Sequence, residues 1–174
     1  MPMSALTLTP LQMQQTLTER VHLCFSQAEQ KLGRPFPRPH IHCNMRGRAA
    51  GAARLQTWEL RFNPALFAAN YQAFLDEVVP HEVAHLLVHA LWGAGRGKGR
   101  VLPHGRQWQS VMQEVFNLEP RTTHSFDLAV LAQPNVTYAC ACQQHQLSIR
   151  RHNKVARGEA NYHCRRCKQV LTRP

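Results

Sequence analysis

With 174 residues, of which 44% are hydrophobic, the chain is long enough for one modest domain and a small appendage. Its 21 Lys and Arg residues against 10 Asp and Glu residues leave a formal net charge of +11, which favours polyanionic partners. The N-terminal residues contain no apolar run of signal-peptide or membrane length, so we expect a cytoplasmic protein with no membrane partner.

The first predicted element is a long helix that begins after Thr9 and ends at Gly33. Thr9, Pro10 and Gln12 match an N-cap, a first-turn proline and a capping-box glutamine. Apolar residues then recur every three or four positions until Gly33 stops the pattern. These apolar positions are Leu17, Val21, Cys24, Phe25, Ala28 and Leu32. We interpret this helix as scaffold.

Residues 38–62 have apolar residues at every second position, which predicts strands of a small antiparallel sheet. The alternating positions are Ile41, Cys43, Met45, Trp58, Leu60 and Phe62. We hypothesise that residues 57–62 form an edge strand that holds an extended peptide by backbone pairing. Asn63 and Pro64 then predict the capped start of a short helix.

Residues 71–92 are predicted to form a buried helix that carries the sequence His-Glu-Val-Ala-His, beginning at His81. Histidines four residues apart lie on the same helix face, so His81 and His85 can bind one metal ion. This H-E-x-x-H pattern is typical of a catalytic zinc site with an open fourth position for water. Glu82 is then placed to accept that water's proton. Pro80 predicts a kink just before the motif.

The alternative for His81 and His85 is that both are ordinary core residues. Burying unpaired imidazoles beside a carboxylate costs about 1–3 kcal/mol each, which favours the metal site. His89 continues the four-residue series, but eight residues of helix place it roughly 12 Å from His81. A core or supporting role is therefore predicted for His89.

After Trp92, glycines alternate with the cations Arg96, Lys98 and Arg100. Such a segment cannot bury much apolar area. It is predicted to be either a solvated linker or a basic lid that brings nucleic acid or substrate to the metal.

His104 precedes a predicted helix whose apolar stripe runs from Trp108 to Phe116. A histidine near a helix N-terminus lies in a field that opposes protonation, which suits a neutral metal ligand. His104 is therefore the predicted third ligand of the catalytic zinc. The acidic alternatives are Glu114, Glu119 and Asp127, at positions typical of a solvated surface.

Two close pairs of cysteines, separated by 21 residues, follow Tyr138. The pairs are Cys140 with Cys142 and Cys164 with Cys167. In a cytoplasmic chain this pattern is typical of a zinc ribbon with four cysteine ligands, a closed structural site. His145 is an alternative ligand in place of Cys140. The segment has too few apolar residues for a core without metal, so zinc is expected to stabilise its fold.

Residues 137–174 contain eight Lys and Arg residues against Glu159 alone, which predicts a surface for DNA that is single-stranded or partly so. A solvated basic surface is the alternative. The candidate DNA contacts of the ribbon are Arg150, Arg151, Lys154, Arg157, Arg165 and Arg166. The glycine-rich segment adds the candidates Arg96, Lys98 and Arg100.

Several segments together resemble the bacterial SprT family over nearly the whole chain. They are residues 78–87, Pro103-His104-Gly105 with Trp108, and residues 122–126, 138–153 and 158–167. SprT-like domains also occur in Spartan, a DNA-dependent zinc protease that degrades proteins crosslinked to DNA. The resemblance implies His81, His85 and His104 as zinc ligands, Glu82 as the catalytic residue, and DNA-bound proteins as substrates.

We therefore predict an α+β protein with a zincin-like metallopeptidase core at 8–136, built of helices on a small antiparallel sheet, and a zinc ribbon at 137–174. One catalytic and one structural zinc ion are expected. Glu82 is predicted to take a proton from water as a peptide bond is attacked. The candidate oxyanion stabilisers are His89, Arg106 and His124. The rival hypotheses are a zinc-stabilised DNA-binding or regulatory protein without peptidase activity, and a hydrolase of non-peptide amides.

Overall fold

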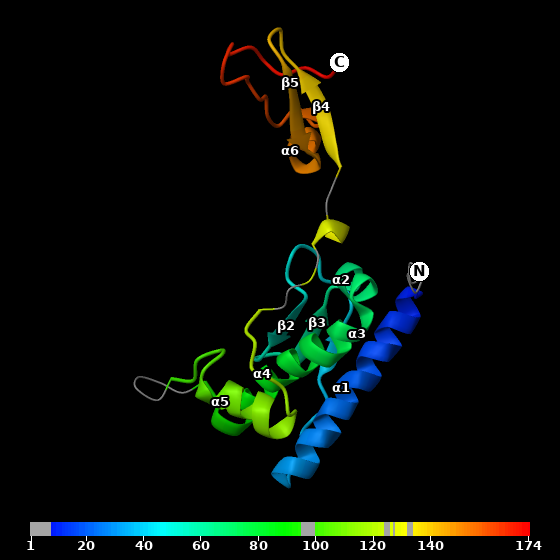
Figure 1. Ribbon diagram of the computed structural model, residues 1–174, viewed down its shortest axis with the longest axis vertical. Coiled ribbons are helices and arrows are strands. Elements are labelled where there is room, and N and C mark those ends of the chain that lie inside the picture. Colours follow the sequence, from blue (N-terminus) through cyan, green and yellow to red (C-terminus); the bar gives the residue numbers. More distant parts are fainter. Residues whose placement is uncertain (1–7, 95–99, 124–125, 127, 132–133) are drawn as a thin grey trace. The chain divides into compact units, whose positions relative to one another are not determined.

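The computed structural model describes residues 8–94, 100–123, 126, 128–131 and 134–174. The chain divides into two compact units, Met1–Leu131 and Ala132–Pro174. Figure 1 labels the main elements of both units. Each unit is described by itself below. Within the described ranges, none of the helices combines the length and apolarity needed to span a bilayer.

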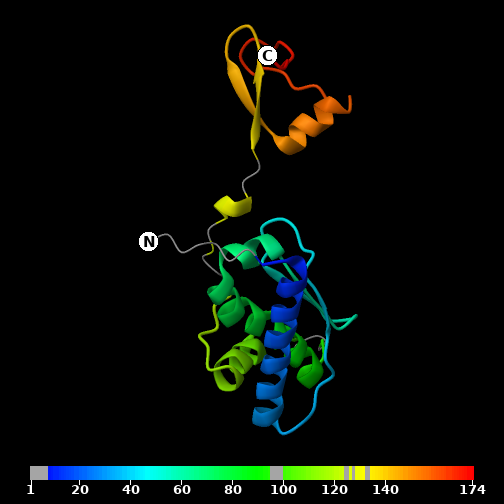
Figure 2. The ribbon, with the colours of Figure 1, turned by 90° about the vertical axis from the view of Figure 1, so that its right-hand side faces the viewer.

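The first unit begins with helix α1, Pro10–Leu32, which runs along the length of this unit in Figure 2. Thr9 and Gln12 form the predicted capping box, because each side chain bonds the backbone of the other residue. Gly33 ends the helix with a φ of 65°, a left-handed conformation that glycine adopts at little cost. Both ends of this predicted helix are confirmed.

Three short strands form one sheet in the order β1-β3-β2. The strands are β1 (His40–His42), β2 (Gly51–Arg54) and β3 (Glu59–Phe62). Strand β3 pairs antiparallel with β2 but parallel with β1, so the predicted small sheet is mixed rather than purely antiparallel. The connection from β1 to β2 is long enough to carry the chain past the position of β3, so that β2 pairs on the other side of β3.

The central position of β3 also corrects the hypothesis for residues 57–62. These residues do not form an edge strand, because β3 has a hydrogen-bonded neighbour on each side. The edge strand that contacts helix α4 (Val79–Trp92) is β2 instead. Alternating apolar residues show that a strand exists, but the order of strands depends on pairing between distant residues.

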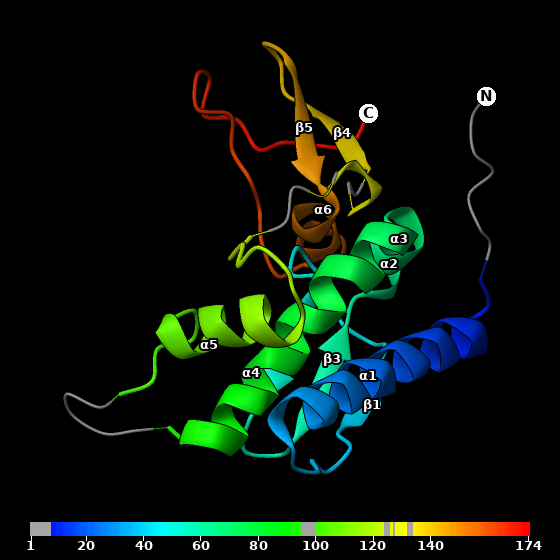
Figure 3. The same cartoon turned by 60° about the horizontal axis from the view of Figure 1, so that its bottom comes forward.

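Helices α1 and α4 pack against each other and cover one face of the sheet, α1 over β1 and α4 over β2 (Figure 3). Leu60 and Phe62 of β3 point into this layer and are fully buried. The core between the layers also contains Leu17, Phe25, Phe67, Phe74 and Trp108, all without solvent exposure. This core fixes the distance between α4, which carries the H-E-x-x-H motif, and β2, which lies next to it.

The approach to α4 contains the shorter elements α2 (Pro64–Ala69), α3 (Tyr71–Ala73) and the π-helical turn η1 (Phe74–Val78). In η1 the N–H of Val79 donates to Phe74 O, five residues back, and Arg20 Nε of α1 donates to the released Leu75 O at 2.9 Å. The irregularity predicted before Pro80 thus takes the form of a π turn.

After α4, the first unit continues with α5 (Arg106–Ser110), the π turn η3 (Val111–Val115) and the short 3₁₀ turn η4 (Ala129–Leu131). Helix α5 and η3 lie alongside α4. Trp108, Val111, Met112, Val115 and Phe116 are buried there, as the apolar stripe predicts.

The second unit contains an antiparallel hairpin of β4 (Asn135–Ala139) and β5 (Gln144–Ser148), followed by helix α6 (Ile149–Ala156). Its buried core consists of Tyr138, Leu147, Cys164 and Leu171. Such a core is small, which supports the expectation that a metal ion contributes to its stability.

Candidate metal centres

Three histidines of the first unit converge on one point. His81 and His85 lie one turn apart on α4, and His104 is in the turn before α5. The Nε2 atom of His81 lies 3.3 Å from that of His85 and 3.1 Å from that of His104. The structure therefore brings together the three residues predicted as zinc ligands.

This spacing fits a zinc ion. Three nitrogens at about 2.0–2.1 Å from one tetrahedral centre lie roughly 3.3 Å from each other. Metal binding also needs neutral imidazoles. Burial, and then the neighbouring His81 and His104, lower the pKa of His85 to about 3. Burial also lowers the pKa of His104. Zinc bound to these three nitrogens would retain one coordination position for water or substrate.

Glu82 lies next to the first ligand and is 7% exposed. Burial raises the pKa of its carboxyl group to about 8, and a hydrogen bond from the Ala53 N–H of β2 opposes this shift. The position of this carboxyl group beside the three histidines suits a residue that accepts and returns a proton. Glu82 is thus positioned as predicted, with a contact to β2 that the sequence pattern did not indicate.

Beside these residues lies an open cavity of about 880 Å³. The three histidines, Glu82 and residues 49–53 line it, together with apolar side chains that include Val88, Val101 and Met112. The N–H of Asn63 donates to Ala50 O at 2.8 Å. By the alternation of an antiparallel pair, the N–H and C=O groups of Gly51 and Ala53 then point to the open edge of β2.

The other candidate residues of the first unit are less centrally placed. His89 and Arg100 line the cavity, but His89 is not part of the histidine cluster. Its Nδ1 atom is buried without a hydrogen-bond partner. Arg106 begins α5 and does not line the cavity.

Two of the acidic alternatives to His104, Glu114 and Glu119, do not belong to the histidine cluster. Glu114 and Glu119 are exposed, and Arg121 pairs with Glu119 at 2.8 Å. Arg96, Lys98, His124 and Asp127 lie outside the described residues.

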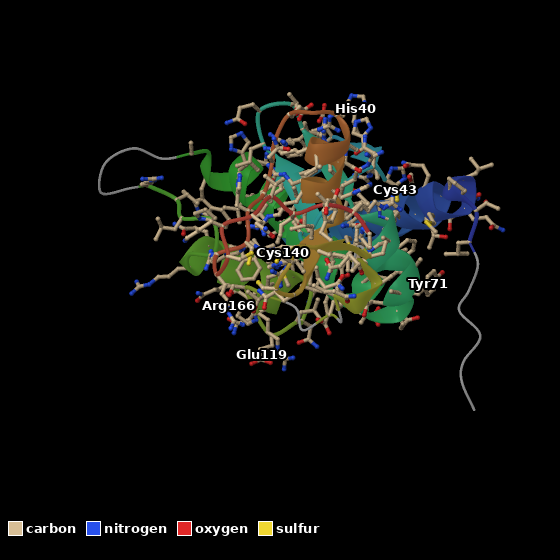
Figure 4. The ribbon with its side chains drawn as sticks, turned by 90° about the horizontal axis from the view of Figure 1, so that it is seen from above. His40, Cys43, Tyr71, Glu119, Cys140 and Arg166 are labelled. Atoms are coloured by element: carbon tan, nitrogen blue, oxygen red, sulfur yellow. The ribbon has the colours of Figure 1, made fainter. Side chains whose placement is uncertain are left out.

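In the second unit, the Sγ atoms of Cys140, Cys142, Cys164 and Cys167 all lie within 4.8 Å of one another. Cys140 follows β4 and is labelled in Figure 4. The Sγ of Cys142 lies 3.4 Å from that of Cys140 and 3.6 Å from that of Cys164. Sulfurs at about 2.3 Å from a tetrahedral zinc ion lie roughly 3.8 Å apart, so the four residues fit a closed site.

His145, the alternative ligand, lies just outside this cluster. Its Nε2 atom is 3.3 Å from the Cys140 Sγ, close enough for a hydrogen bond to the sulfur. The hydrogen bond to Cys140 raises the pKa of His145, and the pKa of Cys140 is lowered to about 5. His145 is therefore close enough to hydrogen-bond the Cys140 sulfur.

The cations of the second unit are divided between two environments. Arg150, Arg151 and Lys154 of α6 line a cavity of about 550 Å³ with Tyr162 and the polar residues Asn135, Gln146 and Ser148. The guanidinium of Arg151 lies 5.6 Å from the Tyr162 ring centre. Three cations, an aromatic ring and side-chain amides suit a phosphate with an attached base.

Arg157, Arg165 and Arg166 do not line this cavity. Arg157 is instead bound by Glu159 at 2.6 Å and 3.0 Å, which partly neutralises it. Arg165 and Arg166 are exposed in the turn between Cys164 and Cys167, and Figure 4 labels Arg166. Among the predicted contacts of the second unit, the α6 cations are therefore the ones that line a pocket.

The sequence pattern did not identify Gly51 and Ala53 as site residues. Their only local signal is the run of small residues at 49–53, which lets a strand approach another element closely. Asn135, Gln146 and Ser148 were also missed, because the hairpin brings them to α6 through pairing that is not visible in one strand alone.

Comparisons with known proteins agree with this geometry. Residues 21–124 match the SprT-like family and residues 137–173 match the SprT-like zinc ribbon domain. Protein SprT of Shewanella oneidensis is 49% identical over 160 residues, which cover 92% of this chain and 99% of the relative. Protein SprT of Erwinia tasmaniensis is 49% identical over 158 residues, with 91% and 89% covered.

Protein SprT of Photorhabdus laumondii is 44% identical over 162 residues, which cover 93% of this chain and 80% of the relative. No solved structure matches the chain. A family match over more than half of the chain, with relatives that align over almost its whole length, shows that this chain belongs to the SprT-like family.

Proposed function

We propose that this chain is a zinc-dependent peptidase that acts on proteins bound or crosslinked to DNA. The observation that carries the proposal is the position of Glu82, a buried carboxyl group beside three histidines whose Nε2 atoms are spaced for one zinc ion. A purely structural zinc site has no use for such a group or for an open coordination position.

When bound, zinc supplies a Lewis acid that lowers the pKa of water and polarises a carbonyl group. Glu82 acts as general base and accepts a proton from the attacking water. It then returns this proton to the amine that leaves when the peptide C–N bond breaks. Ala53 N–H holds the carboxyl group in place between these two proton transfers.

The open edge of β2 favours the proposal that the substrate is a protein. Apart from the Ala53 N–H, which donates to Glu82, the outward N–H and C=O groups of this strand border the cavity, so an extended chain can pair with β2 while its scissile bond reaches the histidines. The apolar cavity wall, with Val88, Val101 and Met112, accepts an apolar side chain next to that bond.

The α6 pocket of the zinc ribbon favours the proposal that the chain associates with DNA. The pocket of Arg150, Arg151, Lys154 and Tyr162 offers charge for a phosphate and a ring for an unpaired base, a combination that favours single strands. The same pocket would serve the rival function, a zinc-stabilised DNA-binding or regulatory protein, which needs no catalytic carboxyl group.

The test is the cleavage of an unstructured basic protein by the wild type and by Glu82→Gln, with and without a single-stranded oligonucleotide. Zinc content is measured for both proteins, and Glu114→Gln removes an exposed carboxylate as the matched control. We expect DNA-stimulated cleavage by the wild type and the control. Glu82→Gln should lose at least about 10²-fold in rate with unchanged zinc.

Cleavage by Glu82→Gln at the wild-type rate would contradict the catalytic role of this residue. If neither protein cleaves but both bind the oligonucleotide, the regulatory function is favoured. A cleavage rate that DNA does not alter would contradict the proposed dependence on DNA, but not the peptidase activity.

A further inference from the structure

Strand β2 approaches α4 so closely at Gly51 that a side chain there would meet the side chain of Glu82. A Cβ atom on Gly51 would lie 2.7 Å from Cγ, 2.8 Å from Oε1 and 3.0 Å from Cδ of Glu82. Real Cβ atoms essentially never approach other heavy atoms this closely, so either Glu82 or the strand would have to move. Glu82 is only 7% exposed, and the space into which its side chain could move is the cavity that it lines, away from β2.

The backbone conformation does not explain this glycine. The φ angle of Gly51 is outside the left-handed region, unlike those of Gly33, Gly47 and Gly93. Alanine would therefore be compatible with the local backbone. The requirement for glycine at this position comes from the space between β2 and the Glu82 side chain.

Two contacts of β2 meet at Glu82. Gly51 and Ala53 are two residues apart, so they face the same side of the strand, toward α4. Gly51 allows the close approach, and the Ala53 N–H donates to the carboxyl group. A methyl group on Gly51 would push the carboxyl group toward the cavity or pull β2, with its Ala53 N–H, away from α4.

We infer that Gly51 is a positioning residue for Glu82: its missing side chain lets β2 hold the carboxyl group at a set distance from the three histidines. Its partner in this role is the backbone of Ala53. Gly51 acts through Glu82 and has no side chain that could take part in the reaction. The kinetic consequence rests on the proposed peptidase function, but the contact itself does not.

The contact is tested by a double-mutant cycle of thermal unfolding with metal-free wild type, Gly51→Ala, Glu82→Ala and the double variant. Gly51→Ala should lower the unfolding midpoint by roughly 3–10 °C when Glu82 is present. In the Glu82→Ala background, where the clashing atoms are gone, the same substitution should cause little or no drop. Equal drops in both backgrounds would overturn the inference.

If Gly51→Ala does not fold, the double variant decides, because removing the Glu82 side chain should restore folding. A double variant that also fails to fold would overturn the inference. This cycle gives its result even if the wild type cleaves no substrate, in which case the peptidase proposal alone fails.

The kinetic readout separates positioning from general damage. Gly51→Ala should keep the wild-type zinc content, because the zinc ligands are not displaced, and should lose on the order of 10²-fold in kcat through the misplaced carboxyl group. A folded Gly51→Ala that loses zinc or raises KM at constant kcat would contradict the positioning role.

Discussion

The indole Nε1 of Trp108 donates a hydrogen bond to the backbone oxygen of His81 at 3.4 Å, and the two ring centres lie 4.8 Å apart. The Trp108 ring also packs against His104, at 4.8 Å, and His85, at 5.9 Å. One fully buried side chain thus supports all three predicted zinc ligands. Its position explains how His104, 23 residues from His81, is held against α4.

We therefore expect Trp108→Ala to affect both stability and metal binding. The cavity that it leaves should lower the free energy of unfolding by about 3–5 kcal/mol, as measured by urea unfolding of the metal-free protein. Zinc affinity, measured by chelator competition, should fall by about 10–100-fold, because the ligands lose their support.

The matched control is Trp92→Ala, since Trp92 is 47% exposed and does not line the cavity. Trp92→Ala should change neither the free energy of unfolding nor the zinc affinity substantially. Unchanged zinc affinity in a folded Trp108→Ala variant would show that the histidines are organised without this contact.

Metal removal should affect the ribbon most strongly. Apart from Cys164, the buried core among the described residues of the second unit consists of only Tyr138, Leu147 and Leu171. With a zinc chelator, we expect hydrogen exchange at the amides of β4 and β5 to become fast, while those of α1 stay protected. Cys167→Ser should make hydrogen exchange at the amides of β4 and β5 fast without chelator.

The control for the ribbon experiment is His104→Ala, which alters the other metal centre and should leave β4 and β5 protected. Protected amides in the chelated hairpin would mean that zinc is not needed for this fold.

DNA binding by the ribbon should depend steeply on salt. We expect Arg150→Ala with Arg151→Ala to reduce the slope of log affinity against log salt by roughly 1.4, since each phosphate contact of a single strand contributes about 0.7. The measurement is fluorescence anisotropy with a labelled single-stranded oligonucleotide between low and moderate salt.

Lys168→Asn with Arg173→Ala is the matched control, because it removes two cations of the same unit that lie outside the pocket. Asparagine is used because Lys168 has a φ of 63°, which asparagine tolerates. If both double variants reduce the slope equally, binding follows total charge and not the α6 pocket.

Glu29 near the end of α1 predicts a pH dependence of stability. Hydrogen bonds from Arg38, at 2.7 Å and 2.9 Å, and then from the Phe36 N–H, lower the pKa of its carboxyl group from 4.5 to about 2. A pKa lowered by folding stabilises the protein above the unfolded-state pKa, and this contribution is lost as the pH falls through the folded-state pKa.

Glu29→Gln should therefore lower the unfolding midpoint at pH 7, and the difference from the wild type should shrink as the pH falls from about 4.5 to about 2. Glu114→Gln, an exposed carboxylate, controls for the loss of one charge. A difference between wild type and Glu29→Gln that stays constant over this range would contradict the role of the Arg38 pair.

Local signals predicted the parts of the fold that depend on nearby residues. The capping box of Thr9, the αL end at Gly33 and the Asn63 cap of α2 each involve residues within a few positions of one another. The face shared by His81 and His85 likewise follows from helix geometry alone. The fold class could be predicted for the same reason.

Relationships across the fold could not be predicted in this way. The central place of β3 depends on pairing with β1 and β2. The π turn before Pro80 depends on Arg20 of α1, whose Nε donates a hydrogen bond to Leu75 O. The contact of Gly51 with Glu82 joins a strand to a helix 31 positions later in the sequence. Periodicity within one segment contains no information on these pairings.

The proposed mechanism depends on zinc held by His81, His85 and His104, with one position left open beside Glu82. The direct measurement is zinc-edge X-ray absorption of the wild-type protein together with its zinc content. We expect two zinc ions per chain and, averaged over both, about two sulfurs at ~2.3 Å and two nitrogens or oxygens at ~2.0–2.1 Å. A single zinc ion per chain with four sulfur ligands would contradict the catalytic site.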